Sequence, residues 1–240
     1  MNRHSQSARQ LAHSIVHANS YRQSHAEARL TPESPALTIA LSRQVGAGGT
    51  SIATEVGNRL GWPVYDHALL ERIADEMHLR TKLLESVDER QMPWLTETLT
   101  SFSQAPSINT STYVRHMIQI VLSLAAHGSC IIVGRGSPYI LPPATTLRVR
   151  LIADREHRIL GLSRERNISR AQADAQLDSI DRDRIGFIRD HFLKDPRDPQ
   201  NFDMVLNSSC FSYTECAEII IEALHRVEAR VKAGEASSRI

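Results

Sequence analysis

The sequence is poor in cysteine and has no long hydrophobic run. Three Cys among 240 residues are too few for a disulfide framework and form no CxxC pair, so we expect a reduced, cytoplasmic protein. The longest apolar stretches, such as residues 130–133 (CIIV), are far shorter than the roughly 20 residues that cross a bilayer. The first ten residues, MNRHSQSARQ, lack the apolar segment of a secretory signal. We therefore expect no membrane partner.

Charge of one sign is also not in excess. Lys and Arg number 28 and Asp and Glu number 27, which gives a formal net charge of +1 at pH 7. This balance argues against a globally basic protein that binds nucleic acid and against an acidic tail, so we expect no nucleic-acid partner. The sequence also has no HExxH motif, paired CxxC or EF-hand loop, which disfavours a structural metal site.

The composition changes after residue 35. Residues 1–35 are mostly polar and end in the helix-breaking segment TPESP, which predicts an N-terminal arm that is helical or disordered. We expect residues 36–233 to form the folded domain, with lid and acceptor-side helices at about 154–198.

Strands and helices are expected to alternate along that domain. Short apolar runs near residues 37–41, 130–133, 147–151 and 201–207 predict buried strands. Amphipathic or charged helical segments are predicted between and after these strands, at about 51–60, 69–77, 113–126, 154–193 and beyond Ser212. The alternation predicts a three-layer α/β/α fold with a central parallel sheet and a helical lid. Ligands of such sheets bind at the carboxyl ends of the strands.

A glycine-rich turn follows the first predicted strand. Residues 42–50 read SRQVGAGGT and lead into a helix. In such a turn the main chain can approach an anion, and the free N–H groups of the helix point at it. The same turn could simply connect a strand to a helix. We predict that it binds phosphate through Gly46, Ala47, Gly48, Gly49, Thr50 and Ser51.

The turn departs from the P-loop pattern GxxxxGK[ST] at the lysine. When Gly48 is aligned with the second Gly of the pattern, Gly49 falls on the Lys and Thr50 on the Ser/Thr. Thr50 could still bind Mg²⁺. The charge of the lysine is missing, and Arg43, which falls on the first Gly, is the nearest candidate to replace it.

Motifs farther along the chain resemble those of cytidylate kinases. Residues 62–72 (WPVYDHALLER) resemble the segment after the P-loop helix of that family. In it, Asp66 and Arg72 keep the family's spacing, while His67 and Ala68 replace Thr-Gly. Taken alone, Asp66 could simply cap the following helix, and Arg72 could be a surface charge.

Two further motifs carry the same resemblance. Residues 133–136 (VGRG) resemble the strand that ends in G-R-D, whose Arg holds the acceptor phosphate. In this chain Gly136 stands where the family has the acid. Asp181 and Arg184 resemble the family's D-x-x-R pair near the lid, although their charged surroundings are equally typical of a solvated helix face.

The sequence is most similar to a divergent cytidylate kinase-like group. The turn SRQVGAGG and the late segment DPQNFDMVLN at residues 198–207 match that group, and the resemblance extends over about residues 37–226. It implies a P-loop NTPase-like fold and transfer of phosphate from ATP, with Mg²⁺, to CMP or dCMP. It also implies a set of substrate-binding residues: Asp66, Arg72, Arg135, Asp181 and Arg184.

Residues 148–170 carry an excess of positive charge. Seven Arg and three acidic residues lie in this range, where a nucleoside monophosphate kinase has its lid. Arg155 and Arg158 are spaced to share one helix face, and we expect them to approach the ATP phosphates when the lid closes. Arg43, Arg135, Arg155 and Arg158 are therefore the predicted catalytic residues. Two alternatives stay open, a kinase of a different small acceptor and a nucleotide-binding regulator without catalysis.

Overall fold

The computed structural model describes residues 37–66 and 112–233. The predicted arm at residues 1–35, the predicted helix at 69–77 and Arg72 lie outside the described residues. Within the described residues, five strands form one sheet in the order β2-β3-β1-β4-β5, and every neighbouring pair is parallel. The strands are β1 (Thr38–Arg43), β2 (Val64–Tyr65), β3 (Cys130–Val133), β4 (Thr146–Ile152) and β5 (Met204–Asn207). The predicted parallel sheet is thus confirmed.

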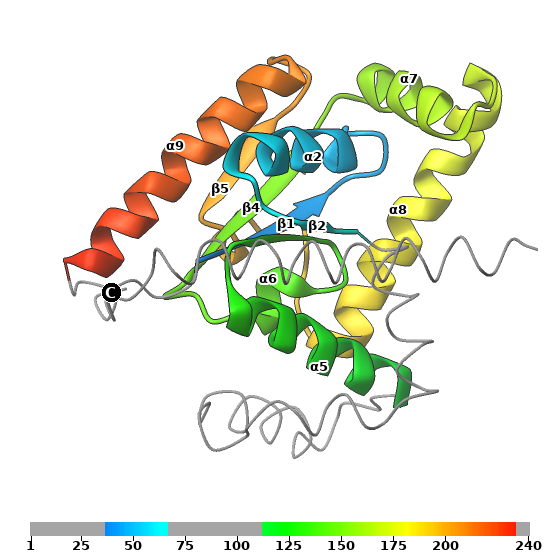
Figure 1. Cartoon of the computed structure of the whole chain (residues 1–240). Coiled ribbons are helices and arrows are strands. Elements are labelled where there is room, and N and C mark those ends of the chain that lie inside the picture. Colours follow the sequence, from blue (N-terminus) through cyan, green and yellow to red (C-terminus); the bar gives the residue numbers. More distant parts are fainter. Residues whose placement is uncertain (1–36, 67–111, 234–240) are drawn as a thin grey trace, which may run out of the picture. The chain divides into compact units, whose positions relative to one another are not determined.

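Helices cover both faces of this sheet (Figure 1). One face is covered by α2 (Gly49–Leu60) and α9 (Tyr213–Lys232), and the other by α5 (Thr112–His127), the short α6 (Ser137–Ile140) and part of α8 (Arg170–Phe192). The helix α7 (Arg155–Arg166) follows β4 and precedes α8, and a 3₁₀ turn, η3 (Pro199–Asn201), precedes β5. These layers confirm the α/β/α fold.

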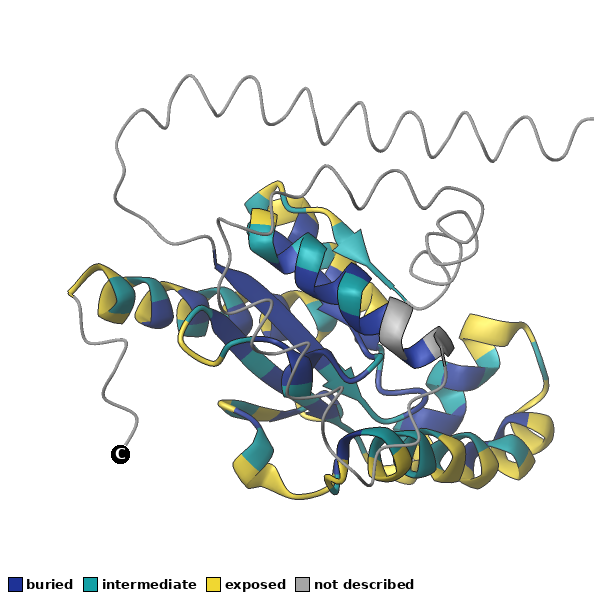
Figure 2. Cartoon of the chain, turned by 90° about the horizontal axis from the view of Figure 1, so that it is seen from below, coloured by how far each residue is buried: buried dark blue, intermediate teal, exposed yellow. Residues whose placement is uncertain are grey.

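Alternation along the strands divides the core between the two faces. On β1, Ile39 and Leu41 pack in the cluster shared with α2 and α9, whereas Ala40 packs in the cluster shared with α5 and α6. All three side chains are fully buried, as expected for a strand covered on both faces. Figure 2 shows the central strands as almost continuously buried, and β3 is buried along its whole length.

Local signals fix where several helices begin and end. Ser169 and Ser212 each form a capping box with the residue three positions later, which supplies acceptors to N–H groups that the first turn leaves unpaired. The pattern Ser-x-x-Glu at residues 212–215 is the sequence signature of such a box. Gly61 ends α2 in the left-handed region, where a glycine carries no Cβ penalty.

The helices α7 and α8 have a small core of their own. It contains Ile159 and Leu162 from α7 and Ala173 and Leu177 from α8, and a fifth member, Val45, comes from the glycine-rich turn. The turn is therefore anchored in the core of the helix pair that corresponds to the predicted lid. No helix within the described segments is both long and apolar enough to cross a membrane.

Candidate functional site

The glycine-rich turn lies between β1 and α2. Gly48 is the N-cap of α2 in a left-handed conformation, with φ of 71°, and no side chain caps the helix. The first-turn N–H groups of a helix have no intrahelical acceptor and carry partial positive charge. Thr50 and Ser51, at the start of the helix, are exposed. The start of α2 therefore has main-chain N–H groups that could bind an anion, while the ring of Tyr213 lies against Gly48 and the stem of Arg43 lies against Gly49.

Contacts with α7 and α8 hold the turn in place. The main-chain N–H of Val45 donates to Oδ1 of Asp181 over 3.1 Å, and the other carboxylate oxygen accepts from Arg158. Gly46 lies directly on α7, because a Cβ at that position would overlap the carbonyl oxygen of Arg158. A Cβ at Gly161 would in turn overlap the carbonyl oxygen of Gly46. The backbones of the turn and of α7 are thus in direct contact.

The side chain of Arg43 runs across the start of α2. A Cβ at Gly49 would lie 2.7 Å from Cγ of Arg43, and a Cβ at Gly134 would overlap its Nη1 atom. The guanidinium group therefore ends against the turn between β3 and α6. A lysine at position 49, as in the usual P-loop, would collide with the stem of Arg43. The absence of that lysine has a steric reason in this chain.

A cavity of about 410 Å³ opens beside Arg43, a volume typical of small-molecule sites. It lies between the carboxyl ends of β1 and β3, α6, α8 and the segment that follows α8. It brings together Arg43, Arg135, Asp181 and Arg184 of the predicted site. Its charged lining residues are Arg43, Arg135, Arg150, Arg166, Arg184, Arg197, Asp181 and Asp183.

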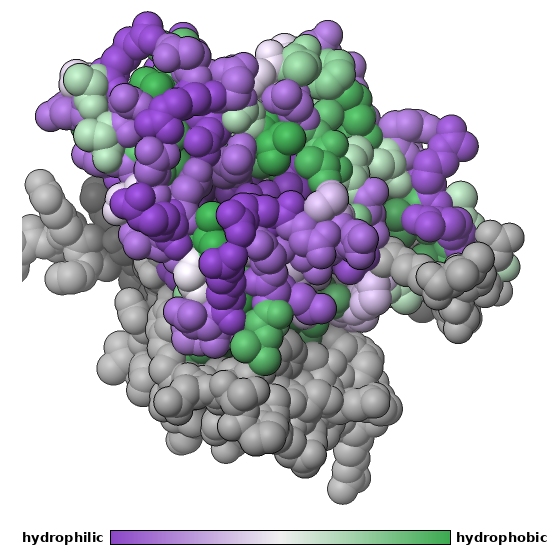
Figure 3. Space-filling model, turned by 180° about the vertical axis from the view of Figure 1, so that it is seen from behind, coloured by the Kyte–Doolittle hydropathy of each residue, from purple (hydrophilic) through white to green (hydrophobic). Residues whose placement is uncertain are grey.

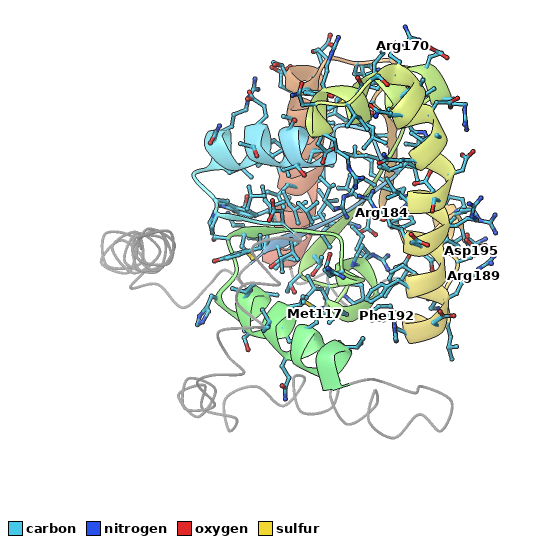
Figure 4. The ribbon with its side chains drawn as sticks, turned by 90° about the vertical axis from the view of Figure 1, so that its right-hand side faces the viewer. Met117, Arg170, Arg184, Arg189, Phe192 and Asp195 are labelled. Atoms are coloured by element: carbon cyan, nitrogen blue, oxygen red, sulfur yellow. The ribbon has the colours of Figure 1, made fainter. Side chains whose placement is uncertain are left out.

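Two of these arginines have no partner within the described residues. Arg43 makes no hydrogen bond or ion pair with them, and Nη1 of Arg184 is buried without a hydrogen-bond partner. Burial, together with the positive charge of Arg184, lowers the pKa of the Arg43 guanidinium, and burial likewise lowers that of Arg184. Figure 4 shows Arg184 on the inner side of α8, whereas Arg189 and Asp195 lie toward its outer side. Like charges this close are unfavourable unless an anion lies between them.

Arg135 lies in an unusual backbone conformation at the edge of the cavity. Its φ is 53°, and the flanking Gly134 and Gly136 also have positive φ. A non-glycine residue in this region is uncommon and is often associated with a functional site. Its guanidinium lies over the ring of Phe187 at 5.8 Å. A Cβ at Gly136 would overlap the ring of Phe192, so an acid at this position would displace that ring.

The remaining predicted residues lie elsewhere. Arg155 is half exposed and pairs with Asp174 and Asp178 on α8, with N–O distances of 2.7 and 2.9 Å. Arg158 is buried against Asp181, and neither arginine lines the cavity. Asp66 follows β2 and is not a lining residue, although its charge acts on Arg43.

Several polar residues of the cavity were not predicted from the sequence. Tyr139 and Arg197 were not singled out, and Arg150 was counted with the lid although it lies on β4. The available signal for Arg150 was its position between Val149 and Leu151 on a strand predicted to be buried. On the face seen in Figure 3, hydrophilic residues predominate over the described elements.

Metal ligands are sparse in the described segments. No group of three or more His, Cys, Asp or Glu that could hold a metal ion occurs among the described residues. A Mg²⁺ ion commonly keeps several waters and binds through few protein groups together with substrate phosphates. The exposed hydroxyl of Thr50 is compatible with that kind of coordination, whereas a dedicated protein cage is not found in this part of the chain.

Solved structures share this architecture. An uncharacterized protein from Eubacterium ventriosum superimposes with a TM-score of 0.63 at 18% identity, over 79% of this chain and 98% of that one. A shikimate kinase from Bacteroides thetaiotaomicron matches with a TM-score of 0.43 at 15% identity, over 80% and 97% of the two chains. The first of these similarities shows a shared fold and no more.

Comparison with curated proteins gave no match. A family model, in contrast, matches residues 38–210. That range runs from β1 through the turn, the cavity and α7–α8 to the end of β5, so it contains every described residue of the candidate site. The chain belongs to the cytidylate kinase-like family.

Proposed function

We propose that this protein transfers the γ-phosphoryl group of ATP to a small acceptor in the arginine-lined cavity, with CMP or dCMP as the first candidates. Its membership of the cytidylate kinase-like family supports a nucleotide or small-molecule kinase. The observation that carries the proposal is the position of Arg43, which touches both the start of α2 and the turn at Gly134. One cation therefore lies between a cradle suited to donor phosphates and a cavity suited to an anionic acceptor.

The donor side would use the main chain of the glycine-rich turn. The uncapped start of α2 presents N–H groups and the positive end of the helix dipole, which favour phosphate. Thr50 would contribute a hydroxyl to Mg²⁺, whose role in such reactions is to neutralise charge on the donor phosphates. Arg43 would supply the positive charge that a P-loop lysine supplies elsewhere.

The acceptor side would use Arg135 and Arg184. Arginine binds phosphate oxygens in pairs and keeps its proton. Since phosphoryl transfer depends mainly on positioning and charge stabilisation, guanidinium groups that line a cavity suit the reaction. The contacts of α7 and α8 with the turn would help to exclude water. We place the reaction in the cytoplasm, where thiols stay reduced, as all three Cys are.

A kinase of another small anionic acceptor is the second candidate. The observation that favours it is Gly136, where cytidylate kinases carry an acid. The ring of Phe192 lies where a side chain at that position would project, so the chain lacks one group that the resemblance would assign to the nucleotide. If the acceptor is not a cytosine nucleotide, the roles proposed for the other residues of the site stay the same.

An assay of ADP release over a panel of acceptors tests the proposal. We expect turnover with ATP and Mg²⁺ plus at least one of CMP, dCMP, UMP, AMP, shikimate and gluconate. Turnover with only a non-nucleotide acceptor would support the second candidate. If ATP raises the melting temperature but no acceptor is phosphorylated, the protein is a nucleotide-binding regulator and the proposal is wrong.

A further inference from the structure

Two arginines on the same face of β4 have opposite environments. Arg148 forms a two-point ion pair with Asp203, at 2.9 Å from Nη2 to Oδ1 and 3.3 Å from Nε to Oδ2. Arg150, two residues later, has no ion pair with any described residue. Its Nη1 donates to the Ser42 hydroxyl over 2.6 Å, and its guanidinium lies 5.8 Å from the ring centroid of Phe202. Burial lowers its pKa, so holding this cation inside costs free energy.

The same cavity contains a hydroxyl group without a hydrogen-bond partner. The hydroxyl of Tyr139 on α6 is buried and has no hydrogen-bond partner among the described residues, and both Tyr139 and Arg150 line the cavity. Burial raises the pKa of Tyr139 to about 12, so the hydroxyl keeps its proton. Its ring packs beside those of Phe192 and Phe202 at centroid distances of 6.0 and 6.2 Å.

These two donors lie in a different part of the cavity from Arg43. The guanidinium of Arg43 ends at Gly134 beside the start of α2. Arg150 and Tyr139 both lie near Phe202, which follows η3. A small molecule in the cavity could therefore present one group to Arg43 and another to Arg150 and Tyr139.

We propose that Arg150 and Tyr139 form a second subsite, which binds an oxygen group on the acceptor molecule away from the group that is phosphorylated. The inference rests on the proposed function for its ligand. A guanidinium can only donate hydrogen bonds, and a protonated phenol has one hydrogen bond to donate, so an acceptor oxygen without a proton of its own suits both groups. A base carbonyl, a carboxylate and a second phosphate share this chemistry.

Stability in the absence of ligand supplies a test that does not depend on turnover. A buried donor without a partner, as in Tyr139, and a buried cation without an ion pair, as in Arg150, both cost stability, and we expect such groups to be kept where a ligand uses them. We therefore expect Tyr139→Phe and Arg150→Met each to leave the melting temperature of the unliganded protein unchanged or to raise it by about 2 to 4 °C. The matched control, Arg148→Met, breaks an ion pair and should lower the melting temperature. A fall for both Tyr139→Phe and Arg150→Met would assign them a structural role and overturn the inference.

Ligand binding identifies the oxygen group. Calorimetry compares ribose 5-phosphate, whose ring form carries only hydroxyl groups besides its phosphate, with CMP, which adds a base carbonyl, and with ribose 1,5-bisphosphate, which adds an anion. We expect CMP or the bisphosphate to bind at least tenfold more tightly than ribose 5-phosphate, and this gain to be lost in Tyr139→Phe and Arg150→Met but kept in Arg148→Met. A gain that survives both substitutions would contradict the subsite. If the wild-type protein binds none of the three, CMP is excluded as the acceptor, and the melting temperatures decide whether Arg150 and Tyr139 form a ligand subsite.

Discussion

Arg43 and Gly49 depend on each other because the stem of the arginine lies where a side chain at position 49 would begin. The distance of 2.7 Å between that Cβ position and Cγ of Arg43 is too short for any non-glycine residue without movement. A chain with the usual lysine at 49 would need a small residue at 43. The cation can therefore be supplied either by an arginine at position 43 or by a lysine at position 49, but not by both in this conformation.

A double substitution tests this exchange. Gly49→Lys alone should lower stability by about 1–3 kcal/mol through overpacking, and Arg43→Gly alone should reduce kcat about a hundredfold by removing charge at the transferring phosphate. In Arg43→Gly/Gly49→Lys we expect stability to return to the Arg43→Gly level and kcat to rise at least tenfold above either single variant. Denaturation curves and steady-state kinetics give both readings. Additive losses in the double variant would show that the positions are independent.

The three thiols differ in burial, which makes a simple probe of β3. Cys210 is exposed, whereas Cys130 and Cys216 are buried. Burial raises the pKa of Cys130 to about 12, so that at pH 9 only about one molecule in a thousand carries the thiolate that reacts with disulfide reagents.

We therefore expect one fast-reacting thiol in the native protein at pH 7 and again at pH 9. This fast-reacting thiol should be absent in Cys210→Ser. In the wild-type protein, all three thiols should react after denaturation. Titration with a chromogenic disulfide reagent measures this directly. Rapid labelling of Cys130 in the native protein would mean that β3 is more accessible than its burial indicates.

At the scale of elements, α7 and the glycine-rich turn behave as one unit. Gly161 faces the carbonyl oxygen of Gly46, Val45 lies in the core of α7 and α8, and Asp181 accepts from the Val45 N–H. Residues 136 positions apart are thus joined by one hydrogen bond. We infer that the conformation of the phosphate cradle depends on the position of this helix pair.

Substitution of two glycines that lie within helices distinguishes the effect of this contact on stability from the effect of helix propensity. Gly161→Ala adds a Cβ that overlaps the backbone of the turn, whereas Gly186→Ala in α8 adds one that meets nothing within 4 Å. We expect Gly161→Ala to lower the free energy of unfolding by about 1–3 kcal/mol and to weaken ATP binding. Gly186→Ala should raise that free energy by about 0.5–1 kcal/mol and leave ATP affinity unchanged. Equal effects of the two substitutions in chemical denaturation would argue against a tight contact between α7 and the turn.

At the scale of the whole described domain, local patterns located many of the elements, although they did not predict α6 or the break between α7 and α8. The strand Cys130–Val133 has the predicted bounds, the helix predicted at 113–126 spans Thr112–His127, and the capping box at Ser212 is present. Apolar periodicity and caps act over a few residues, so the sequence carries them directly.

Long-range pairing was not accessible in the same way. Arg148 and Arg150 occupy equivalent alternating positions in the sequence of β4. In the structure, however, Arg148 forms an ion pair with Asp203, whereas Arg150 lines the cavity. Arg155 and Arg158 were expected to act together, but they meet different acids of α8. The partner of each arginine depends on where α8 and β5 pack in the folded domain. Local sequence patterns do not determine that packing.

Transfer of radiolabel from ATP tests the central claim most directly. The protein is incubated with γ-³²P-labelled ATP, Mg²⁺ and the acceptor panel, and the products are separated by thin-layer chromatography. Our account predicts that the label moves to one acceptor in the wild-type protein and that this transfer falls about a hundredfold in Arg43→Gly. Label that stays in ATP, or that passes only to inorganic phosphate with every acceptor, would contradict it.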